Sequence, residues 1–160
     1  MSFSAQVKNE LARIIHENPQ VQLSELSAII RMSGTLKLMG FNKLSFVINT
    51  ENPAIARKVF TLIKNCFGIT VEIQVNRQSN LKRNNTYVLS VTYDQGANDI
   101  LEKVGIIEKE GEHLSWVSTI PKHLVSRQDG KRAYLRGAFL GSGSVSDPAK
   151  MYHLEFSTVN

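Results

Sequence analysis

Two nine-residue stretches decide the fold: LSAIIRMSG at residues 26–34 and LRGAFLGSG at residues 135–143. Each has the pattern of a helix that ends in a small residue and a glycine, and each is followed at a similar distance by a strand pattern. The final glycines are 109 residues apart (143 − 34), and a phenylalanine in the strand that follows recurs after 110 residues (156 − 46). Because self-similarity at a fixed offset is typical of an internal repeat, the chain is predicted to contain two related units.

Hydrophobic periodicity predicts the same order of elements in both units. Apolar residues at helical spacing indicate helices, and period-two alternation indicates half-buried strands. The predicted helices span residues 3–16, 22–33, 53–67, 97–104 and 131–141, and the predicted strands span residues 35–39, 43–50, 69–75, 87–93, 144–145 and 152–158. The order is therefore ααββαββα through residue 105, and it begins again as αββ near residue 130. Residues 106–120 have no clear pattern, and 114–117 fit either a short strand or an extended packing segment.

The composition is that of one compact domain, with 160 residues, 42% hydrophobic and 21% charged. Lysine and arginine (19) outnumber aspartate and glutamate (14), and the resulting net charge of +5 and isoelectric point near 9.4 favour a polyanionic partner without identifying one. The single cysteine, Cys66, excludes a disulfide framework and a cysteine-based metal cage within one chain. No export signal or apolar run of the roughly 20 residues needed to cross a bilayer is evident, so we expect a cytoplasmic protein without a membrane partner.

The repeated unit resembles one half of the LAGLIDADG homing-endonuclease fold. In both nine-residue stretches the first leucine and the last glycine match the ends of that motif, and Ala28 and Gly137 occupy the position at which two motif helices pack closely. The whole chain resembles the N-terminal part of the WhiA family of bacterial DNA-binding proteins, and the resemblance is carried by residues 2–4, 25–34, 50–57 and 132–140.

The resemblance implies an α+β fold, a LAGLIDADG-like αββαββα saddle with one complete repeat plus the truncated start of a second. Residues 1–105 would form the first repeat with its N-terminal helix, residues 106–129 a linker, and residues 130–160 the start of the second repeat. The family's C-terminal helix-turn-helix domain would be absent. Members of the family act in transcription regulation, sporulation or cell division. Because a truncated second half leaves apolar surface exposed, self-association through the motif helices is a further expectation.

The resemblance also predicts that the chain is not an enzyme. LAGLIDADG nucleases place an acidic residue just before the final glycine of each motif, where two carboxylates hold divalent metal. Here those positions are Ser33 and Ser142, and an earlier acidic position holds Arg31 in the first motif and Leu140 in the second. The four histidines lack metal-ligand spacing, so we expect no catalytic residue, metal or cofactor.

Double-stranded DNA is the expected partner, and the protein would then be associated with the nucleoid. Phosphate-binding candidates are cations near the predicted hairpins and at the start of the second motif helix, namely Arg77, Lys82, Arg83, Lys37, Lys43, Arg132 and Arg136. Solvated loops carry similar numbers of cations, so the residues alone leave both interpretations open. The outward residues Gln74, Asn76, Asn85 and Thr92 fit either base readers or ordinary strand surface. The alternative function is a protein-interaction scaffold, with DNA binding left to the helix-turn-helix domain.

Overall fold

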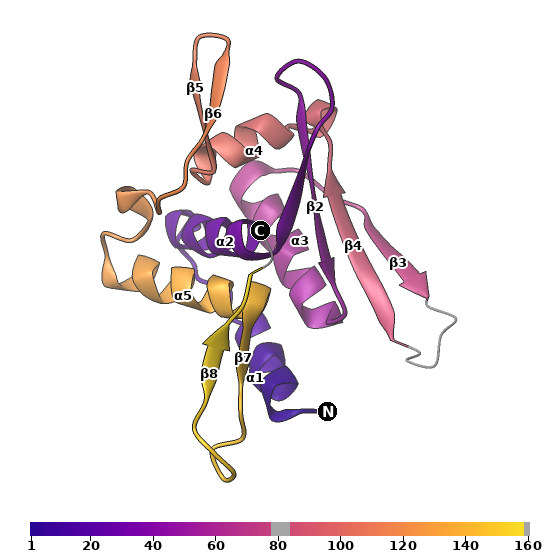
Figure 1. Cartoon of the computed structure of the whole chain (residues 1–160), viewed down its shortest axis with the longest axis vertical. Coiled ribbons are helices and arrows are strands. Elements are labelled where there is room, and N and C mark those ends of the chain that lie inside the picture. The colour runs from indigo at the N-terminus through magenta and orange to yellow at the C-terminus, as the bar shows by residue number, and fades with distance from the viewer. Residues whose placement is uncertain (78–83, 159–160) are drawn as a thin grey trace.

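The computed structural model describes residues 1–77 and 84–158 (Figure 1). Its elements, in chain order, are α1 (Phe3–Ala12), α2 (Pro19–Ser33), β1 (Gly34–Leu38), β2 (Leu44–Thr50), α3 (Pro53–Phe67), β3 (Ile73–Arg77), β4 (Asn85–Val91), the 3-10 helix η1 (Tyr93–Gln95), α4 (Ala97–Lys103), β5 (Ile107–Glu110), β6 (His113–Trp116), the 3-10 helix η2 (Lys122–Leu124), α5 (Gln128–Ser142), β7 (Gly143–Val145) and β8 (Leu154–Phe156). The predicted α+β class and the order ααββαββα followed by αββ are confirmed.

Local sequence explains where the helices begin and end. The side chain of Asn52 accepts hydrogen bonds from the backbone N–H groups of Ala54 and Ile55, Pro53 occupies the first turn, and α3 ends at Gly68 with a φ of 71°. Asn18 caps α2 in the same way, ahead of Pro19. No helix in the described part of the chain is long and apolar enough to cross a membrane.

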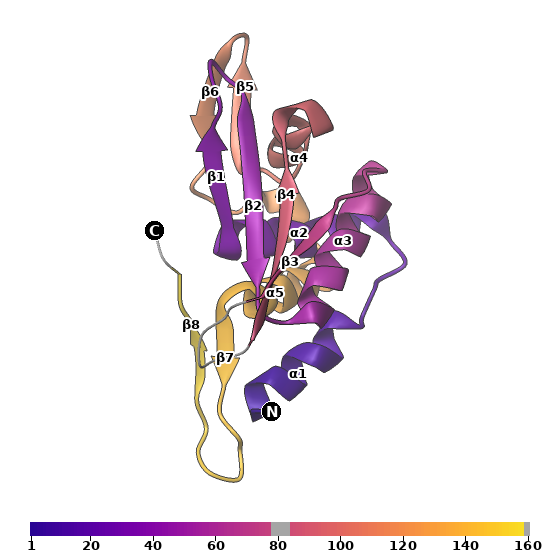
Figure 2. The ribbon, with the colours of Figure 1, turned by 90° about the vertical axis from the view of Figure 1, so that its right-hand side faces the viewer.

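One antiparallel sheet of four strands, in the order β1-β2-β4-β3, forms the centre of the first repeat. Its buried face carries Phe46, Ile48 and Leu89, each at most 1% exposed, and these belong to the main core cluster together with residues of α2, α3 and α4. Figure 2 shows α3 on one side of the strands and, within the described residues, no helix over the other side. The sheet therefore has one face in the core and one open face.

The two motif helices, α2 and α5, pack directly against each other. A Cβ atom placed on Gly137 would lie 2.3 Å from the carbonyl oxygen of Glu25 and 3.0 Å from the Cβ atom of Ala28. The predicted close contact between Ala28 and Gly137 is thus confirmed. Because each motif helix is already buried by the other within one chain, self-association through these helices is not needed to cover them.

Several predicted boundaries were wrong. Helix α1 ends at Ala12, not at residue 16: the carbonyl of Leu11, which would bond to residue 15 in a longer helix, accepts from the N–H of Ile14 and from the ammonium of Lys58. Strand β3 begins at Ile73, not at residue 69, because its pairing with β4 starts there. The unassigned segment forms the β5–β6 hairpin, so the expected linker 106–129 contains ordered structure of its own.

Candidate nucleic-acid interface

The strand register fixes which side chains face away from the helices. Val47 of β2 pairs with Thr35 of β1 and Ser90 of β4, and Gln74 of β3 pairs with Val88 of β4. Directly paired residues of antiparallel strands project from the same face. The open-face positions are therefore Thr35, Lys37, Ser45, Val47, Asn49, Gln74, Asn76, Thr86, Val88 and Ser90.

The open face is polar and weakly cationic. It carries hydroxyl and amide side chains, two valines and the ammonium of Lys37, and none of its strand positions holds a carboxylate. Lys37, Gln74 and Asn76 are all exposed. Hydroxyl, amide and ammonium groups are those that contact phosphates and base edges, so the chemistry of this face is compatible with nucleic acid.

Among the described residues, the other predicted cations of the first repeat, Lys43 and Arg77, are not at strand positions of this face. Lys43 lies in the turn between β1 and β2, and its ammonium is 5.4 Å from the ring centroid of Tyr93. Arg77 pairs with Asn85 and continues the alternation of Ile73 and Val75, so it projects from the face opposite to Gln74 and Asn76. Lys82 and Arg83 lie outside the described residues.

The guanidinium of Arg136, a predicted phosphate contact, lies against a carboxylate. Its Nε donates to the carboxylate of Glu25 at 2.6 Å, and only 15% of its side chain is exposed. A guanidinium held against a buried carboxylate is not free to neutralise a phosphate, and we therefore leave Arg136 out of the interface. Arg132 is exposed, but it lines a depression at the start of α5 together with His16 and Arg127, away from the sheet.

The partner of Arg136 belongs to a buried ionic cluster that sequence analysis missed. The carboxylate of Glu25 (1% exposed) also binds the ammonium of Lys58 at 2.8 Å, so α2, α3 and α5 meet at this carboxylate. Burial lowers the pKa of Lys58, and the negative charge of Glu25 opposes that shift. In the sequence, Glu25 lies 33 positions before Lys58 (58 − 25) and 111 positions before Arg136 (136 − 25), and no local pattern connects the three residues.

The motif ends hold neutral, internally bonded side chains where the resembled nucleases hold carboxylates. The hydroxyl of Ser33 donates to the carbonyl of Ile29 at 2.7 Å, and that of Ser142 donates to the carbonyl of Ala138 at 3.1 Å. Among the described residues, no group of three or more His, Cys, Asp or Glu side chains is placed to hold a metal ion.

Arg31 stands at the earlier position that is acidic in the resembled nucleases. Its guanidinium turns away from the motif end and donates to the backbone carbonyls of Val117 at 2.8 Å and Gly105 at 3.0 Å. Arg31 therefore holds the segment that connects the two repeats.

Comparison with known proteins identifies the family. Residues 19–107 match the family model of the WhiA N-terminal LAGLIDADG-like domain, and residues 131–160 match that of the WhiA LAGLIDADG-like domain. The chain belongs to the WhiA family. It is 52% identical over 159 residues to a probable cell division protein WhiA of Alkaliphilus oremlandii, and 46% identical over 160 residues to one of Clostridium acetobutylicum. These alignments cover 99% and 100% of the chain but 50% of each relative, so the chain spans about half the length of these relatives.

Solved structures show the same fold. The crystal structure of full-length WhiA from Thermatoga maritima matches with a TM-score of 0.68 at 21% identity, covering 100% of this chain and 46% of that one. A structure of I-DmoI in complex with its target DNA matches with a TM-score of 0.51 at 12% identity, covering 80% of this chain and 64% of that one. At these identities the similarity shows the LAGLIDADG-like fold alone.

Proposed function

We propose that this chain is a non-catalytic module that binds double-stranded DNA through the open face of the β1-β2-β4-β3 sheet. The observation that carries the proposal is that face, which has no carboxylate at its strand positions and exposes Lys37 and amides such as Gln74 and Asn76. I-DmoI, which shares the fold, was solved with its target DNA, and this supports DNA as the partner. Such binding would place the protein at the nucleoid and suits a regulator of transcription in sporulation or cell division.

The absence of nuclease activity is part of the proposal. A divalent cation at a scissile phosphate needs charged oxygen ligands. Ser33 and Ser142 offer hydroxyls that already donate to backbone carbonyls, and a neutral hydroxyl does not replace a carboxylate. We therefore expect a duplex incubated with the chain and Mg²⁺ to remain intact under conditions in which it is bound.

Fluorescence anisotropy with a mixed-sequence duplex across a salt series tests DNA binding. A slope of log affinity on log salt of about −3 to −6 would correspond to several neutralised phosphates. Lys37→Gln should make the slope less steep by about 1 and weaken binding to all sequences similarly. Lys64→Gln, which removes an exposed cation in the last turn of α3, should leave the slope unchanged.

A second candidate is a protein-interaction scaffold, and one observation favours it. The end of β1 and the turn that follows it expose three large apolar side chains, Leu38 (70%), Met39 (62%) and Phe41 (79%). Exposed apolar clusters often mark protein interfaces. If a folded sample shows no duplex binding even at low salt, the scaffold function is the one to pursue and the DNA-binding proposal fails.

A further inference from the structure

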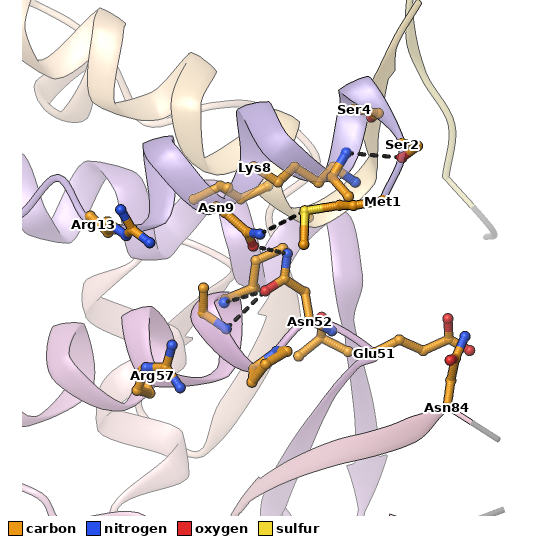
Figure 3. A pocket seen from close by; sticks show the side chains of 17 residues that line it. Met1, Ser2, Ser4, Lys8, Asn9, Arg13, Glu51, Asn52, Arg57 and Asn84 are labelled. Carbon is orange, nitrogen blue, oxygen red and sulfur yellow. Dashed lines mark hydrogen bonds between the residues drawn. The ribbon is translucent and has the colours of Figure 1, made fainter.

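A cleft of about 760 Å³ lies between α1 and the start of α3, with the end of α5 as its third wall. Its volume is in the range of about 300–1,000 Å³ that is usual for small-molecule sites. Its lining comes from α1, the segment from β2 into α3, the first residues before β4, and Leu140 and Gly141 of α5 (Figure 3). None of the open-face residues of the sheet lines it.

The charges of the cleft are separated along its length. Figure 3 shows Arg13 of α1 and Arg57 of α3 at one end, and Glu51 and Asn84 at the other. The two arginines also line one neighbouring depression together, which places them near each other. Lys8 lies along the wall between the two ends. The cleft thus offers an anion-binding end and a hydrogen-bonding end.

The cations of the cleft have no anionic partner. Within residues 1–77 and 84–158, no carboxylate lies within 4.0 Å of the charged nitrogens of Lys8, Arg13 or Arg57. In the depression at the start of α5, by contrast, Arg136 is paired with Glu25 and Arg127 with Asp129. Arg132 in that depression has no such partner among the described residues, so the cleft between α1 and α3 differs in holding three unpaired cations rather than one.

The frame around these cations is held by specific hydrogen bonds. The side chain of Asn9 in α1 accepts a hydrogen bond of 2.9 Å from the amide of Asn52, and Asn52 in turn caps α3. This chain of contacts ties α1 to the start of α3 across the cleft. The positive end of the α3 dipole adds to the potential there, although its first free N–H groups are already bonded to Asn52.

We propose that this cleft binds a small phosphorylated ligand of nucleotide type, with its phosphates between Arg13 and Arg57 and its hydroxyl-bearing part toward Glu51. Paired guanidinium groups suit phosphate oxygens, and a carboxylate accepts hydrogen bonds from sugar hydroxyls. A nucleic-acid strand running through the cleft would bring its phosphates against Glu51, so a short ligand charged at one end fits better. This site is separate from the open face and does not depend on DNA binding there.

The ammonium of Lys8 is a third cation of the cleft. Its side chain is half-buried, its ammonium lies 5.6 Å from the ring centroid of Phe139, and burial lowers its pKa. A bound phosphate beside the ammonium would favour the charged form and raise that pKa again.

Calorimetric titration of the 160-residue chain with ATP and with pyrophosphate, both without divalent metal, tests the proposal. Both probes should bind at one site, and Arg13→Gln or Arg57→Gln should weaken each probe about tenfold, as expected for one charge-assisted contact. Glu51→Gln should weaken ATP but not pyrophosphate. The matched control is Lys64→Gln, which lies on the same helix as Arg57 but outside the cleft, and its affinities should stay within about twofold of the unaltered chain.

Three results would overturn the proposal. The first is no binding of either probe at millimolar concentration by a sample whose circular dichroism shows it folded. The second is equal weakening by Lys64→Gln and Arg57→Gln, which would mean diffuse charge attraction. The third is a loss of duplex affinity in Arg57→Gln with no loss of ATP affinity, which would assign the cleft to nucleic acid. Because Arg13 and Arg57 are exposed, their variants should fold like the unaltered chain.

Discussion

Glu25→Gln should destabilise this protein strongly although the two side chains have almost the same shape. The carboxylate of Glu25 is 1% exposed and lies 2.8 Å from the ammonium of Lys58, which is itself fully buried. At an effective dielectric constant of about 20, two unit charges at this distance attract by about 6 kcal/mol. The amide of glutamine would retain one ordinary hydrogen bond, worth about 1 kcal/mol. The side chain of Arg136 is 15% exposed and can turn toward water, so the loss of its attraction to Glu25 should contribute less.

The expected loss for Glu25→Gln is therefore about 3–5 kcal/mol of unfolding free energy, the usual effect of leaving one buried charge without its partner. Urea denaturation followed by circular dichroism measures it, and Glu51→Gln, an exposed carboxylate, is the control. The double variant Glu25→Gln with Lys58→Met should recover most of the loss, because it removes the uncompensated ammonium. A loss below about 1 kcal/mol for Glu25→Gln, or no recovery in the double variant, would refute the reasoning.

Two further predictions concern packing and titration. Gly137→Ala should lower the free energy of unfolding by about 1–3 kcal/mol, because its Cβ would lie 2.3 Å from the carbonyl oxygen of Glu25. Gly141→Ala, whose Cβ would have its nearest contact at 3.2 Å, should lower it less. Thermal melts compare the two variants, and equal melting temperatures would contradict the close packing of α2 and α5. Burial raises the pKa of the Cys66 thiol to about 11, so the unfolded chain loses this proton first as pH rises, and stability should fall above pH 9. Iodoacetamide alkylation of the folded chain should then have its midpoint near pH 11, and a midpoint near 9 would show a solvated thiol.

The sequence predicted best where local signals decide the structure. Helix α3 begins and ends as predicted, because Asn52, Pro53 and Gly68 act within their own turns. The close contact of Ala28 with Gly137 was predicted from the resemblance to the LAGLIDADG fold, in which these positions bring the two motif helices together. The alternation of Ile73, Val75 and Arg77 in the sequence also indicates that Arg77 projects from the face opposite to Gln74 and Asn76.

What the sequence could not reveal depends on residues that only the fold brings together. Glu25 meets Arg136 over 111 positions, and a glutamate on a motif helix gives no sign that it will be buried with two cations. The cleft proposed for a phosphorylated ligand combines α1, the start of α3 and the end of α5, three segments with no shared motif. Its cations, Lys8, Arg13 and Arg57, look like ordinary surface charges in sequence.

At the ends of the motif helices, positions that are acidic in the resembled nucleases hold side chains that make structural hydrogen bonds. Arg31 stands at a position that is acidic in the resembled enzymes, yet its guanidinium fixes the connection between the repeats through the carbonyls of Gly105 and Val117. Ser33 and Ser142 close their own helices. Replacing both serines with aspartates would introduce two carboxylates, but Arg31 would still hydrogen-bond the carbonyls of the connecting segment in place of an acidic side chain. These contacts support the proposal that the chain binds DNA without cutting it, because both the motif-end hydroxyls and the guanidinium of Arg31 are already used within the fold.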